Sequence, residues 1–577
     1  ILLVTALVST LNVYPSDELL ARPAGLMEPE LGLLYQTALE EDDQRTLSFF
    51  VRTTDVLNTT AAIESVGGTV TTIAGDVLTV RAPAHGFDAI MKLEWIERME
   101  AMKAVSRKLD RARAAVRVND VADGASPLKT GYSGAGVILG IIDRGFDLEH
   151  AAFRRADGTS RVLAVWDQTA TTGEPPGGRW TYGTACDARA IESGCGLQNP
   201  AATHGTHVAG IAGGGKVGSN PWVGVAPNAD LIFVELPAMN SDWETTPEPA
   251  SDGHICDGVA WIFAQAYEQN KPAVVNMSLG SHWGPHDASS LASRCLTNLS
   301  RQGDGTGVPG KILVAAAGNE GAGGGQGFVS WGDGWERTPS YTHASAQLGA
   351  EPLVAPFRLG VSYQLGTQLE PVDIYEDLAS FWFDSDEDLA FRLGVMHSPT
   401  DITWTPPKRF SELMTESHTE MLIGTDVVGH VALFADEMDS GARCFRAYVS
   451  DWNQDGREGE VVFLAELSQI GSSPITVDGF MEVSNDVRAG GFLEIEHPAG
   501  QKMVPDNNMS IGFPGNGPTV IAVASFISRK AMADGSESPE QNRSGDRASS
   551  SSRGPTRNVT ATGLKPDIAA PGQYVVA

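Results

Sequence analysis

The chain has 577 residues, which is room for about two to four domains. Hydrophobic residues make up 42% of it and 64 residues are glycine, so the composition excludes wholesale disorder and a fibrous repeat. The formal net charge of −31 predicts a surface that repels nucleic acids and anionic membranes, and we expect neither as a partner. Such acidity is typical of proteins that stay soluble in a salty or extracellular setting.

Residues 1–44 form a leader that opens with an apolar run, ILLVTALVSTLNV. The run is too short to span a bilayer, and it has neither an initiator Met nor a basic segment before it. It could be the remnant of a signal peptide or an ordinary buried segment, and the sequence leaves both open. The first alternative predicts a secreted protein, extracellular or in the cell envelope.

The chain contains five cysteines and no C-x-x-C motif, which argues against a zinc ribbon or a thioredoxin-type site. Cys186 and Cys195 bracket a short loop and could form a disulfide in an oxidising compartment. An odd count leaves one thiol free, and spacing alone does not settle the pairing.

Residues 45–108 have the pattern of a small α+β unit. TLSFFVRT alternates like a strand, and the helical run after it has Asp55 as N-cap and Gly67–Gly68 as its stop. GTVTTIAGDVLTVRAP predicts two strands about a tight turn, and GFDAIMKLEWIERMEA predicts a second helix that leads into a strand. The order is β-α-β-β-α-β. A basic, helix-prone stretch follows, KAVSRKLDRARAAVR, and is a candidate cleavage site.

Residues 109–335 and 509–577 have the pattern of an α/β domain. Near-continuous apolar runs rich in β-branched residues recur, as expected of strands buried on both faces of a parallel sheet. Helical stretches such as ICDGVAWIFAQAYEQN lie between them, so we expect a doubly wound, mostly parallel sheet. The apolar runs are GVILGIID (136–143), ADLIFVEL (229–236), PAVVNMSLG (272–280), KILVAAAGN (311–319) and TVIAVASF (519–526).

Residues 336–508 have a different pattern. Short alternating runs such as PFRLGVSYQL and EVVFLAEL are separated by turn residues and show little helical periodicity. This pattern predicts an antiparallel β-sandwich. Because the α/β pattern resumes afterwards, we expect the sandwich to be inserted within the α/β domain.

In open α/β sheets ligands bind beyond the carboxyl ends of the strands, so the residues found there are informative. Asp143 ends the first apolar run, and Asn319 ends the fourth. The third run ends in Ser278, Leu279 and Gly280. Polar residues at three strand ends of one sheet predict a built site.

A helix of small residues completes the set. THGTHVAGIAGG begins with Thr203 as its cap, and its small side chains let it pack close to a sheet. His204 lies in the first turn, and His207 follows on the same face. Two His at this spacing could bind a metal, but no acidic third ligand accompanies them in a recognised pattern. A structural hydrogen bond is the alternative role for His207.

An Asp, a His and a strand-end Asn together indicate nucleophilic acyl transfer, in which a carboxylate orients the imidazole, the imidazole takes a proton from a serine, and the amide stabilises the oxyanion. The sequence resembles the subtilisin-like serine peptidases, the subtilases. The resemblance covers about residues 120–335 and 509–577. It rests on five motifs in the family's order: GVILGIIDRGFD, HGTHVAGIAGG, NMSLG, AAAGNEG and SSSSRGPT…LKPDIAAPG.

The resemblance implies a role for each candidate residue. Asp143 would orient the imidazole, His204 would be the general base and Asn319 the oxyanion donor. Two backbone segments would pair with an extended protein or peptide substrate and leave side-chain preference to pockets. The chemistry requires no cofactor. The substrate-pairing residues would be Ser278, Leu279 and Gly280 in one segment and Ala316, Ala317 and Gly318 in the other.

The resemblance also gives the flanking regions candidate roles. Many subtilases carry a prodomain of the order β-α-β-β-α-β, which assists folding and inhibits the site until it is cleaved, so residues 45–108 would be an intramolecular inhibitor. A permanent interaction module is the alternative. Some subtilases carry a jelly-roll-like domain between the Asn and the Ser, the interval that residues 336–508 occupy. Substrate selection and a passive structural role are equally open for it.

The serine motif of the family is missing from the sequence. A G-T-S-[MA]-A segment follows the KPDIAAPG run in subtilases, whereas only QYVVA follows here, and no G-x-S-x-G elbow occurs. Residues Ser549–Ser552 match a non-catalytic stretch of the family instead. We therefore expect the Ser nucleophile to be absent from this chain, as in a sequence truncated at both ends, and the chain alone to be inactive.

DWNQDGREGE resembles the first half of a calcium-binding loop, with Asp451, Asn453 and Asp455 as candidate ligands of a structural calcium. Val462 replaces the bidentate Glu of such loops, so a polar hairpin turn is the alternative. Two functions of other classes also stay open: a pseudo-peptidase that binds partners without cutting them, and an adhesion or glycan-binding role for the sandwich. Retention of the Asp, the His and the Asn together favours the peptidase.

Overall fold

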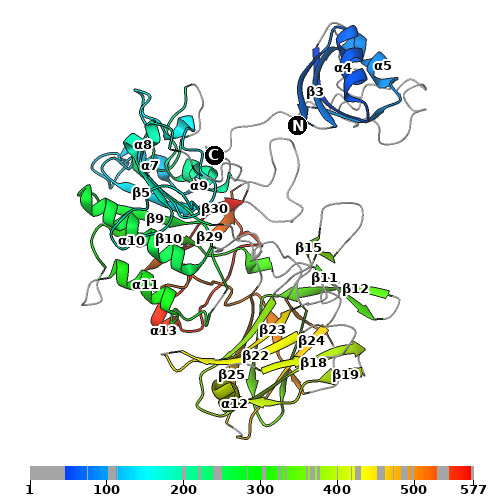
Figure 1. Ribbon diagram of the computed structural model, residues 1–577, viewed down its shortest axis with the longest axis vertical. Helices are drawn as coiled ribbons and strands as arrows, with labels where there is room; N and C mark the ends of the chain where they lie inside the picture. The colour runs from blue at the N-terminus through cyan, green and yellow to red at the C-terminus, as the bar shows by residue number, and fades with distance from the viewer. Residues whose placement is uncertain are drawn as a thin grey trace. The chain divides into compact units, whose positions relative to one another are not determined.

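The computed structural model describes Tyr35 and most of residues 46–573. The longer stretches outside this description are 1–34, 36–45, 102–111, 238–249, 364–370, 423–429, 451–461, 483–490, 529–544 and 574–577, and gaps of one to five residues interrupt the rest. The chain forms two compact units: an N-terminal unit, residues 1–106 with 533–536, and a main unit, residues 107–532 and 537–577 (Figure 1).

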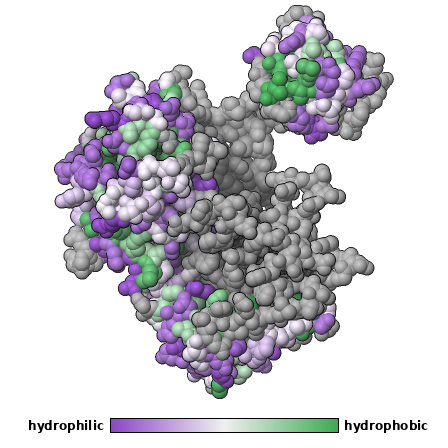
Figure 2. Space-filling model, viewed as in Figure 1, coloured by the Kyte–Doolittle hydropathy of each residue, from purple (hydrophilic) through white to green (hydrophobic). Residues whose placement is uncertain are grey.

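The N-terminal unit is a four-stranded antiparallel sheet with two helices. Its elements follow the order β-α-β-β-α-β, and the strands lie in the order β2-β3-β1-β4. The side chain of Asp55 accepts a hydrogen bond from the Asn58 amide at the start of α4, as expected of an N-cap. Apolar residues gather on the face of this unit that Figure 2 shows, and the exposed apolar side chains include Leu57 and Ile73. The elements are β1 (Thr46–Thr53), α4 (Val56–Ser65), β2 (Thr69–Ala74), β3 (Val77–Pro83), α5 (Ala84–Met91) and β4 (Ile96–Ala101).

The main unit contains an eight-stranded sheet in the order β30-β29-β10-β9-β5-β8-β6-β7. Seven of these strands are parallel, and β7 is antiparallel to β6 at one edge. The predicted α/β fold class, a doubly wound and mostly parallel sheet, is therefore confirmed. The strands are β5 (Ile138–Asp143), β6 (Val162–Asp167), β7 (Thr184–Asp187), β8 (Asp230–Glu235), β9 (Ala273–Met277), β10 (Lys311–Ala316), β29 (Val520–Ile527) and β30 (Ile568–Gln573).

Helices pack on both faces of the central strand β5, which is why this strand is apolar on both sides. Every residue of β5 is buried. Ile138 and Ile142 pack with α10 (Asp252–Glu268) and α11 (Leu291–Ser300), whereas Leu139 and Ile141 pack on the opposite face with α9 (His204–Gly213). Burying a side chain of this size contributes about 1.5–3 kcal/mol, so the two faces together fix the position of β5 in the sheet.

Three strands of the sheet, β6, β7 and β30, lie outside the apolar runs that predicted strands. The edge strand β30 contains Pro571 and Gly572, which weaken a strand pattern but are tolerated at a sheet edge. The strand β7 has only four residues, so its alternating pattern is too short to identify a strand from the sequence.

Two disulfides lie in the α/β domain. Cys186 pairs with Cys195, the pairing that the sequence left open, and Cys256 of α10 pairs with Cys295 of α11. Cys444 is buried and forms no disulfide. The second disulfide ties together the two helices that cover one face of the sheet.

The sandwich, residues 326–506, consists of two mostly antiparallel sheets of nine and seven strands that share one apolar core. Its first strand begins at Gln326, whereas the sequence pattern placed the boundary at 336. Phe391 and Phe463 of one sheet and Phe381 and Phe445 of the other belong to the core. The bounds are β11 (Gln326–Trp331), β12 (Gly334–Tyr341), β13 (His343–Leu348), β14 (Leu353–Arg358), β17 (Asp377–Phe383), β18 (Ala390–Ser398), β19 (Asp401–Trp404), β20 (Lys408–Arg409), α12 (Phe410–Glu416), β21 (Thr419–Leu422), β22 (His430–Glu437), β23 (Arg443–Ser450), β24 (Val462–Ser468), β25 (Ile475–Glu482), β26 (Gly491–Leu493), β27 (Gln501–Lys502) and β28 (Val504–Asp506).

Among the described residues, no helix combines the length and the apolar character that a membrane crossing requires.

Candidate active site

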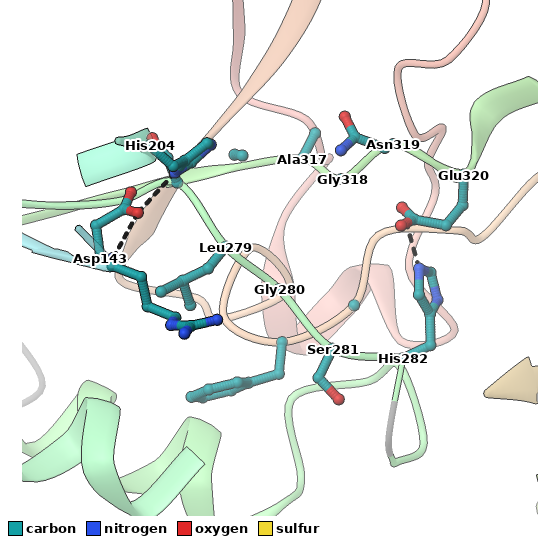
Figure 3. Close-up of a pocket in the computed structure, with 15 residues that line it drawn as sticks. Asp143, His204, Leu279, Gly280, Ser281, His282, Ala317, Gly318, Asn319 and Glu320 are labelled. Carbon is teal, nitrogen blue, oxygen red and sulfur yellow. Dashed lines mark hydrogen bonds and ion pairs between the residues drawn. The ribbon is translucent and has the colours of Figure 1, made fainter. Parts of the chain in front are cut away.

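Asp143 and His204 meet at the carboxyl edge of the eight-stranded sheet. Asp143 is the last residue of β5 and His204 the first residue of α9. The Nδ1 atom of His204 lies 2.6 Å from Oδ1 of Asp143, and the same oxygen accepts a hydrogen bond of 2.7 Å from the backbone N–H of Arg144 (Figure 3). Because the carboxylate is held from two directions, it fixes the orientation of the imidazole ring.

The two side chains differ sharply in exposure. The side chain of Asp143 is 3% exposed and that of His204 is 62% exposed. The hydrogen bond to Asp143 raises the pKa of His204 above its usual value, and burial of the ring opposes this effect only in part. The geometry therefore gives an imidazole whose Nδ1 is engaged while the rest of the ring faces a cleft.

The cleft has a volume of about 300 Å³ and two backbone walls. One wall follows β9 and the other follows β10, and Figure 3 shows the two segments running on either side of the pocket. Asn319 stands at the end of the second wall. All eight of the remaining residues that the sequence singled out for catalysis or substrate pairing also line this cleft: Asp143, His204, Ser278, Leu279, Gly280, Ala316, Ala317 and Gly318.

Gly318 must be glycine for the second wall to have this shape. Its φ of +111° lies in a region that side chains rarely adopt, and a Cβ there would meet the side chains of Glu320 and Ser552. The wall therefore turns sharply just before Asn319, which also lines the cleft.

Residues 134–346 match the model of the subtilase family. The matched part of the chain is similar to a subtilase domain. The chain's sequence is 31% identical to the subtilisin-like protease PopC of Myxococcus xanthus over 200 residues, which are 33% of this chain and 35% of PopC. It is 31% identical to subtilisin DY of Bacillus licheniformis over 201 residues, which are 35% of this chain and 54% of that protein. The chain therefore spans about half or less of the length of these relatives.

The subtilase fold is also that of a solved structure, the CspB protease of Clostridium perfringens. The TM-score is 0.56, and the match covers 80% of this chain and 79% of that chain at 20% sequence identity. At this identity the likeness concerns the fold, and it extends well beyond residues 134–346.

Sequence reasoning missed an ion pair in the cleft of the subtilase domain. Glu320 directly follows Asn319, and its Oε2 lies 3.1 Å from Nε2 of His282 and accepts a hydrogen bond of 2.6 Å from the Ser552 hydroxyl. Burial alone would raise the pKa of Glu320, but the charge of His282 and the hydrogen bonds from His282 and Ser552 outweigh it and lower the pKa to about 2. A charged residue next to the oxyanion candidate was the available signal for Glu320, and His282 gave none.

The serine cluster at 549–552 supports the wall of the cleft that follows β10. Ser551 and Ser552 are each 1% exposed. The Ser551 hydroxyl accepts a hydrogen bond from the Ser525 amide, and the Ser552 amide donates to the Gly318 carbonyl. These contacts agree with the interpretation of the cluster as a loop rather than a nucleophile.

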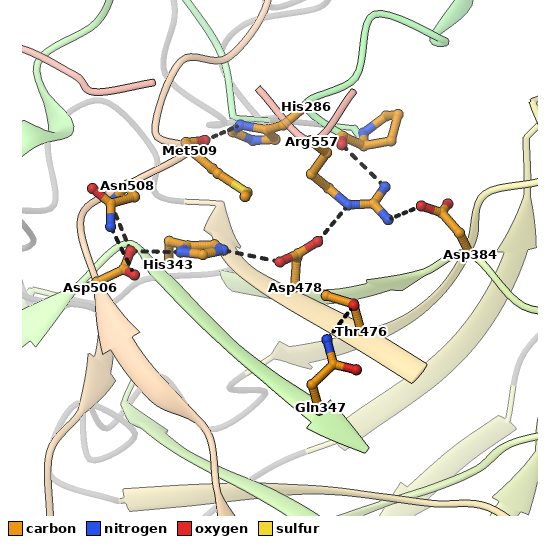
Figure 4. A network of polar contacts seen from close by, with 11 residues as sticks. His286, His343, Gln347, Asp384, Thr476, Asp478, Asp506, Asn508, Met509 and Arg557 are labelled. Carbon is orange, nitrogen blue, oxygen red and sulfur yellow. Dashed lines mark hydrogen bonds and ion pairs between the residues drawn. The ribbon is translucent and has the colours of Figure 1, made fainter. Parts of the chain in front are cut away.

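A buried polar network joins the sandwich to the subtilase domain next to the cleft (Figure 4). Arg557 lies 2.9 Å from Asp478 of the sandwich and 3.9 Å from Asp287 of the subtilase domain. His286 stacks on Phe480 of the sandwich with ring centroids 4.0 Å apart, and its Nε2 lies 3.0 Å from the carbonyl oxygen of His282. The sandwich therefore contacts the segment that carries one side of the cleft.

Of the candidate metal ligands, only the two histidines of α9 lie among the described residues. Asp451, Asn453 and Asp455 lie outside the described residues. His207 lies in α9, where its amide donates to the Thr203 carbonyl. Across the described part of the chain, no group of three or more His, Cys, Asp or Glu side chains is arranged to hold a metal ion.

Proposed function

We propose that the protein is a subtilisin-like serine endopeptidase made as a zymogen. The observation that supports this most is the contact of 2.6 Å between His204 and Asp143, at a cleft that Asn319 also lines. A buried carboxylate behind an exposed imidazole is the arrangement that a general base in acyl transfer requires.

In this mechanism His204 takes the proton of a serine hydroxyl at Nε2 while the serine oxygen attacks the peptide carbonyl carbon. Asp143 stabilises the imidazolium that forms and does not itself take the proton. The side-chain amide of Asn319 donates a hydrogen bond to the oxyanion. His204 then returns the proton to the leaving amine, and a water molecule repeats the sequence to release the acyl group. No step needs a cofactor.

The substrate would be an extended protein or peptide segment that adds to the two backbone walls of the cleft. Such pairing uses main-chain hydrogen bonds and therefore tolerates many side chains. Ser278–Gly280 and Ala316–Gly318 are the segments that offer their backbone. Side-chain preference would come from the side chains that line the pocket, among them the paired Glu320 and His282.

The N-terminal unit would be the prodomain, because its β-α-β-β-α-β order is the one that subtilase prodomains share. As an intramolecular inhibitor it would keep the site closed until the basic stretch after it is cut. The two disulfides support a secreted protein, extracellular or in the cell envelope, because disulfides persist in oxidising compartments.

The nucleophile is the part of the triad for which the 577 residues offer no motif. The proposal requires a serine hydroxyl within hydrogen-bond reach of Nε2 of His204 in the active protein. The decisive experiment begins with the codons that follow Ala577 in the gene. The protein from the complete reading frame is then assayed on casein and on a set of chromogenic peptides, with and without a serine-directed sulfonyl fluoride.

The expected result is a Gly-Thr-Ser segment and hydrolysis that the sulfonyl fluoride blocks. Replacing the oxyanion donor, Asn319→Ala, should lower kcat by roughly 10²–10³-fold with little change in KM, a magnitude known from subtilisin, a relative. A reading frame that ends without such a serine, or a folded protein that cuts none of the substrates, would contradict the proposal. That outcome favours the pseudo-peptidase, a binding protein built on the same cleft.

A further inference from the structure

The turn after Asp143 joins the two members of the His–Asp pair. The backbone N–H of Gly205 donates to the Arg144 carbonyl at 2.6 Å. The backbone N–H and the hydroxyl of Thr206 both donate to the Gly145 carbonyl, at 2.9 and 3.0 Å. Gly205 and Thr206 belong to the first turn of α9, which begins with His204. These hydrogen bonds to the Arg144–Gly145 turn therefore fix the orientation of the first turn of α9.

The approach between turn and helix is close because position 205 is glycine. A Cβ on Gly205 would lie 3.0 Å from the Arg144 carbonyl oxygen and 2.8 Å from the ring of Phe146, which is tighter than ordinary contacts. A small movement of the turn therefore moves the start of α9 with it, since the two backbones touch.

Glu235 holds the other side of this turn. Its two carboxylate oxygens accept the backbone N–H of Gly145 at 2.9 and 2.8 Å. Glu235 ends β8 and lies in register with Asp143 at the end of β5 and with Asp167 at the end of β6. The Glu235 carboxylate thus holds the Gly145 amide, while α9 holds the carbonyl oxygens of Arg144 and Gly145.

A carboxyl group is a costly choice for this position. Glu235 is 0% exposed, and the charged groups that act on it are Asp167, which repels it, and Arg144, which attracts it. Burial raises the pKa of Glu235 to about 7. An apolar side chain would be cheaper to bury, so the position is explained by the hydrogen bond it makes to the turn.

We propose that Glu235 is a positioning residue for the Asp143–His204 pair: it holds the Arg144–Gly145 turn, and the turn holds α9 so that Nδ1 of His204 reaches Oδ1 of Asp143. The catalytic meaning of this role rests on the proposed function, whereas the geometry of the pair does not depend on peptide hydrolysis.

Two variants separate the hydrogen bond from the volume of the side chain. Glu235→Gln keeps the shape and one acceptor oxygen, so Gly145 keeps a partner. Glu235→Met fills the same space but leaves the Gly145 amide without an acceptor. Thr206→Val removes the hydroxyl that binds the Gly145 carbonyl from the other side of the turn, and Thr206→Ser restores it.

The readout is the pKa of His204, measured by NMR titration of the histidine-labelled 577-residue chain with His204→Ala used for assignment. We expect a raised pKa in the parent chain, little change in Glu235→Gln, and a fall of about 0.5–1 unit in Glu235→Met as the Asp143 contact loosens. Thr206→Val should lower the pKa in the same direction, and the combination with Glu235→Met should fall short of the sum, because both act through one turn.

The matched control is Glu466→Met in the sandwich. Glu466 is 9% exposed, and its replacement removes the hydrogen bond that it accepts from Arg392. It should lower the unfolding midpoint and leave the pKa of His204 unchanged. The proposal is overturned if Glu235→Met folds with the parent pKa at His204. Should Glu235→Met not fold, an unchanged His204 pKa in Thr206→Val overturns it instead. Loss of the proposed peptidase function alone would leave the titration result intact, so the two failures are distinguishable.

Discussion

Among the described residues of the main unit, His204 and His343 each lie against an aspartate at nearly the same distance but in very different surroundings. His204 lies 2.6 Å from Asp143, and His343 lies 2.7 Å from Asp506. The His204 side chain is 62% exposed at a cleft, whereas that of His343 is 1% exposed between the sandwich and the subtilase domain. Exposure, rather than the pair itself, separates a candidate for chemistry from a structural contact.

The two histidines also differ in the surroundings of their second ring nitrogen, Nε2. Nε2 of His343 faces a second carboxylate, Asp478, at 3.5 Å, and Asp478 in turn accepts a hydrogen bond from Arg557 (Figure 4). His204 instead lines the cleft that Asn319 also lines. A base needs one nitrogen open to the substrate, and the network around His343 offers none.

Replacing each of the two histidines should give the largest difference between the pairs. In the protein from the complete reading frame, His204→Ala should lower kcat by about a millionfold, the size known for the base of subtilisin, a relative. His343→Asn should lower the unfolding midpoint but leave the kcat of correctly folded molecules unchanged. Steady-state kinetics on equal amounts of folded protein measures both. A loss of kcat of similar size in the two variants would contradict the assignment.

The ions around His343 should matter for stability rather than catalysis. The Arg557 side chain is 3% exposed and contacts Asp478, Asp384 and Asp287. Arg557→Ala removes this cation from two buried carboxylates, Asp478 and Asp287, and should cost about 3–5 kcal/mol in the free energy of unfolding, measured in urea. The matched control is Arg392→Ala, since Arg392 is 32% exposed and pairs with Glu466, and we expect about 1 kcal/mol or less there. Equal losses would show that the Arg557 network is not special.

The pH dependence of stability should follow the buried pair and not the exposed one. Burial disfavours the charged form of His343, but the hydrogen bonds and charges of Asp478 and Asp506 outweigh it and raise its pKa. A histidine with a raised pKa in the folded state stabilises the fold fully below about pH 6.5, its unfolded value, and this stabilisation is lost as pH rises through the folded pKa.

The free energy of unfolding should therefore fall above pH 7 as His343 loses its proton. The stabilisation that Glu235 gains from its raised pKa of about 7 is already largely lost at that pH. His343→Asn should flatten this fall, and His204→Asn should leave most of it because the exposed pair is screened by water. Unfolding midpoints between pH 7 and 9 measure the slopes. A slope that survives in His343→Asn would place the titrating group elsewhere.

The same contrast explains what the sequence could predict. Asp143 ends a buried strand, His204 begins a helix of small residues, and Asn319 closely follows a second apolar strand, so each is marked by a short, recognisable pattern. The parallel sheet brings such ends to one edge, so the cleft could be predicted from local patterns. The α/β class followed from the same runs.

Contacts between residues far apart in the sequence could not be predicted. His343 and Asp506 are separated by 163 positions, and Ser552 and Glu320 by 232. No periodicity or motif links such residues, since only the folded sandwich and the loop after β29 bring them together. Glu235 was overlooked for a related reason: it lies within a predicted apolar run, and nothing local shows that its carboxylate faces the turn after Asp143.

The most direct test of the account is covalent labelling of the protein from the complete reading frame with a fluorophosphonate probe, followed by mass spectrometry of its peptides. The account predicts one labelled serine, loss of the label in His204→Ala and full labelling in His343→Asn. A folded protein that takes up no probe, or a label that persists without His204, would contradict the claim that the Asp143–His204 cleft is a serine peptidase site.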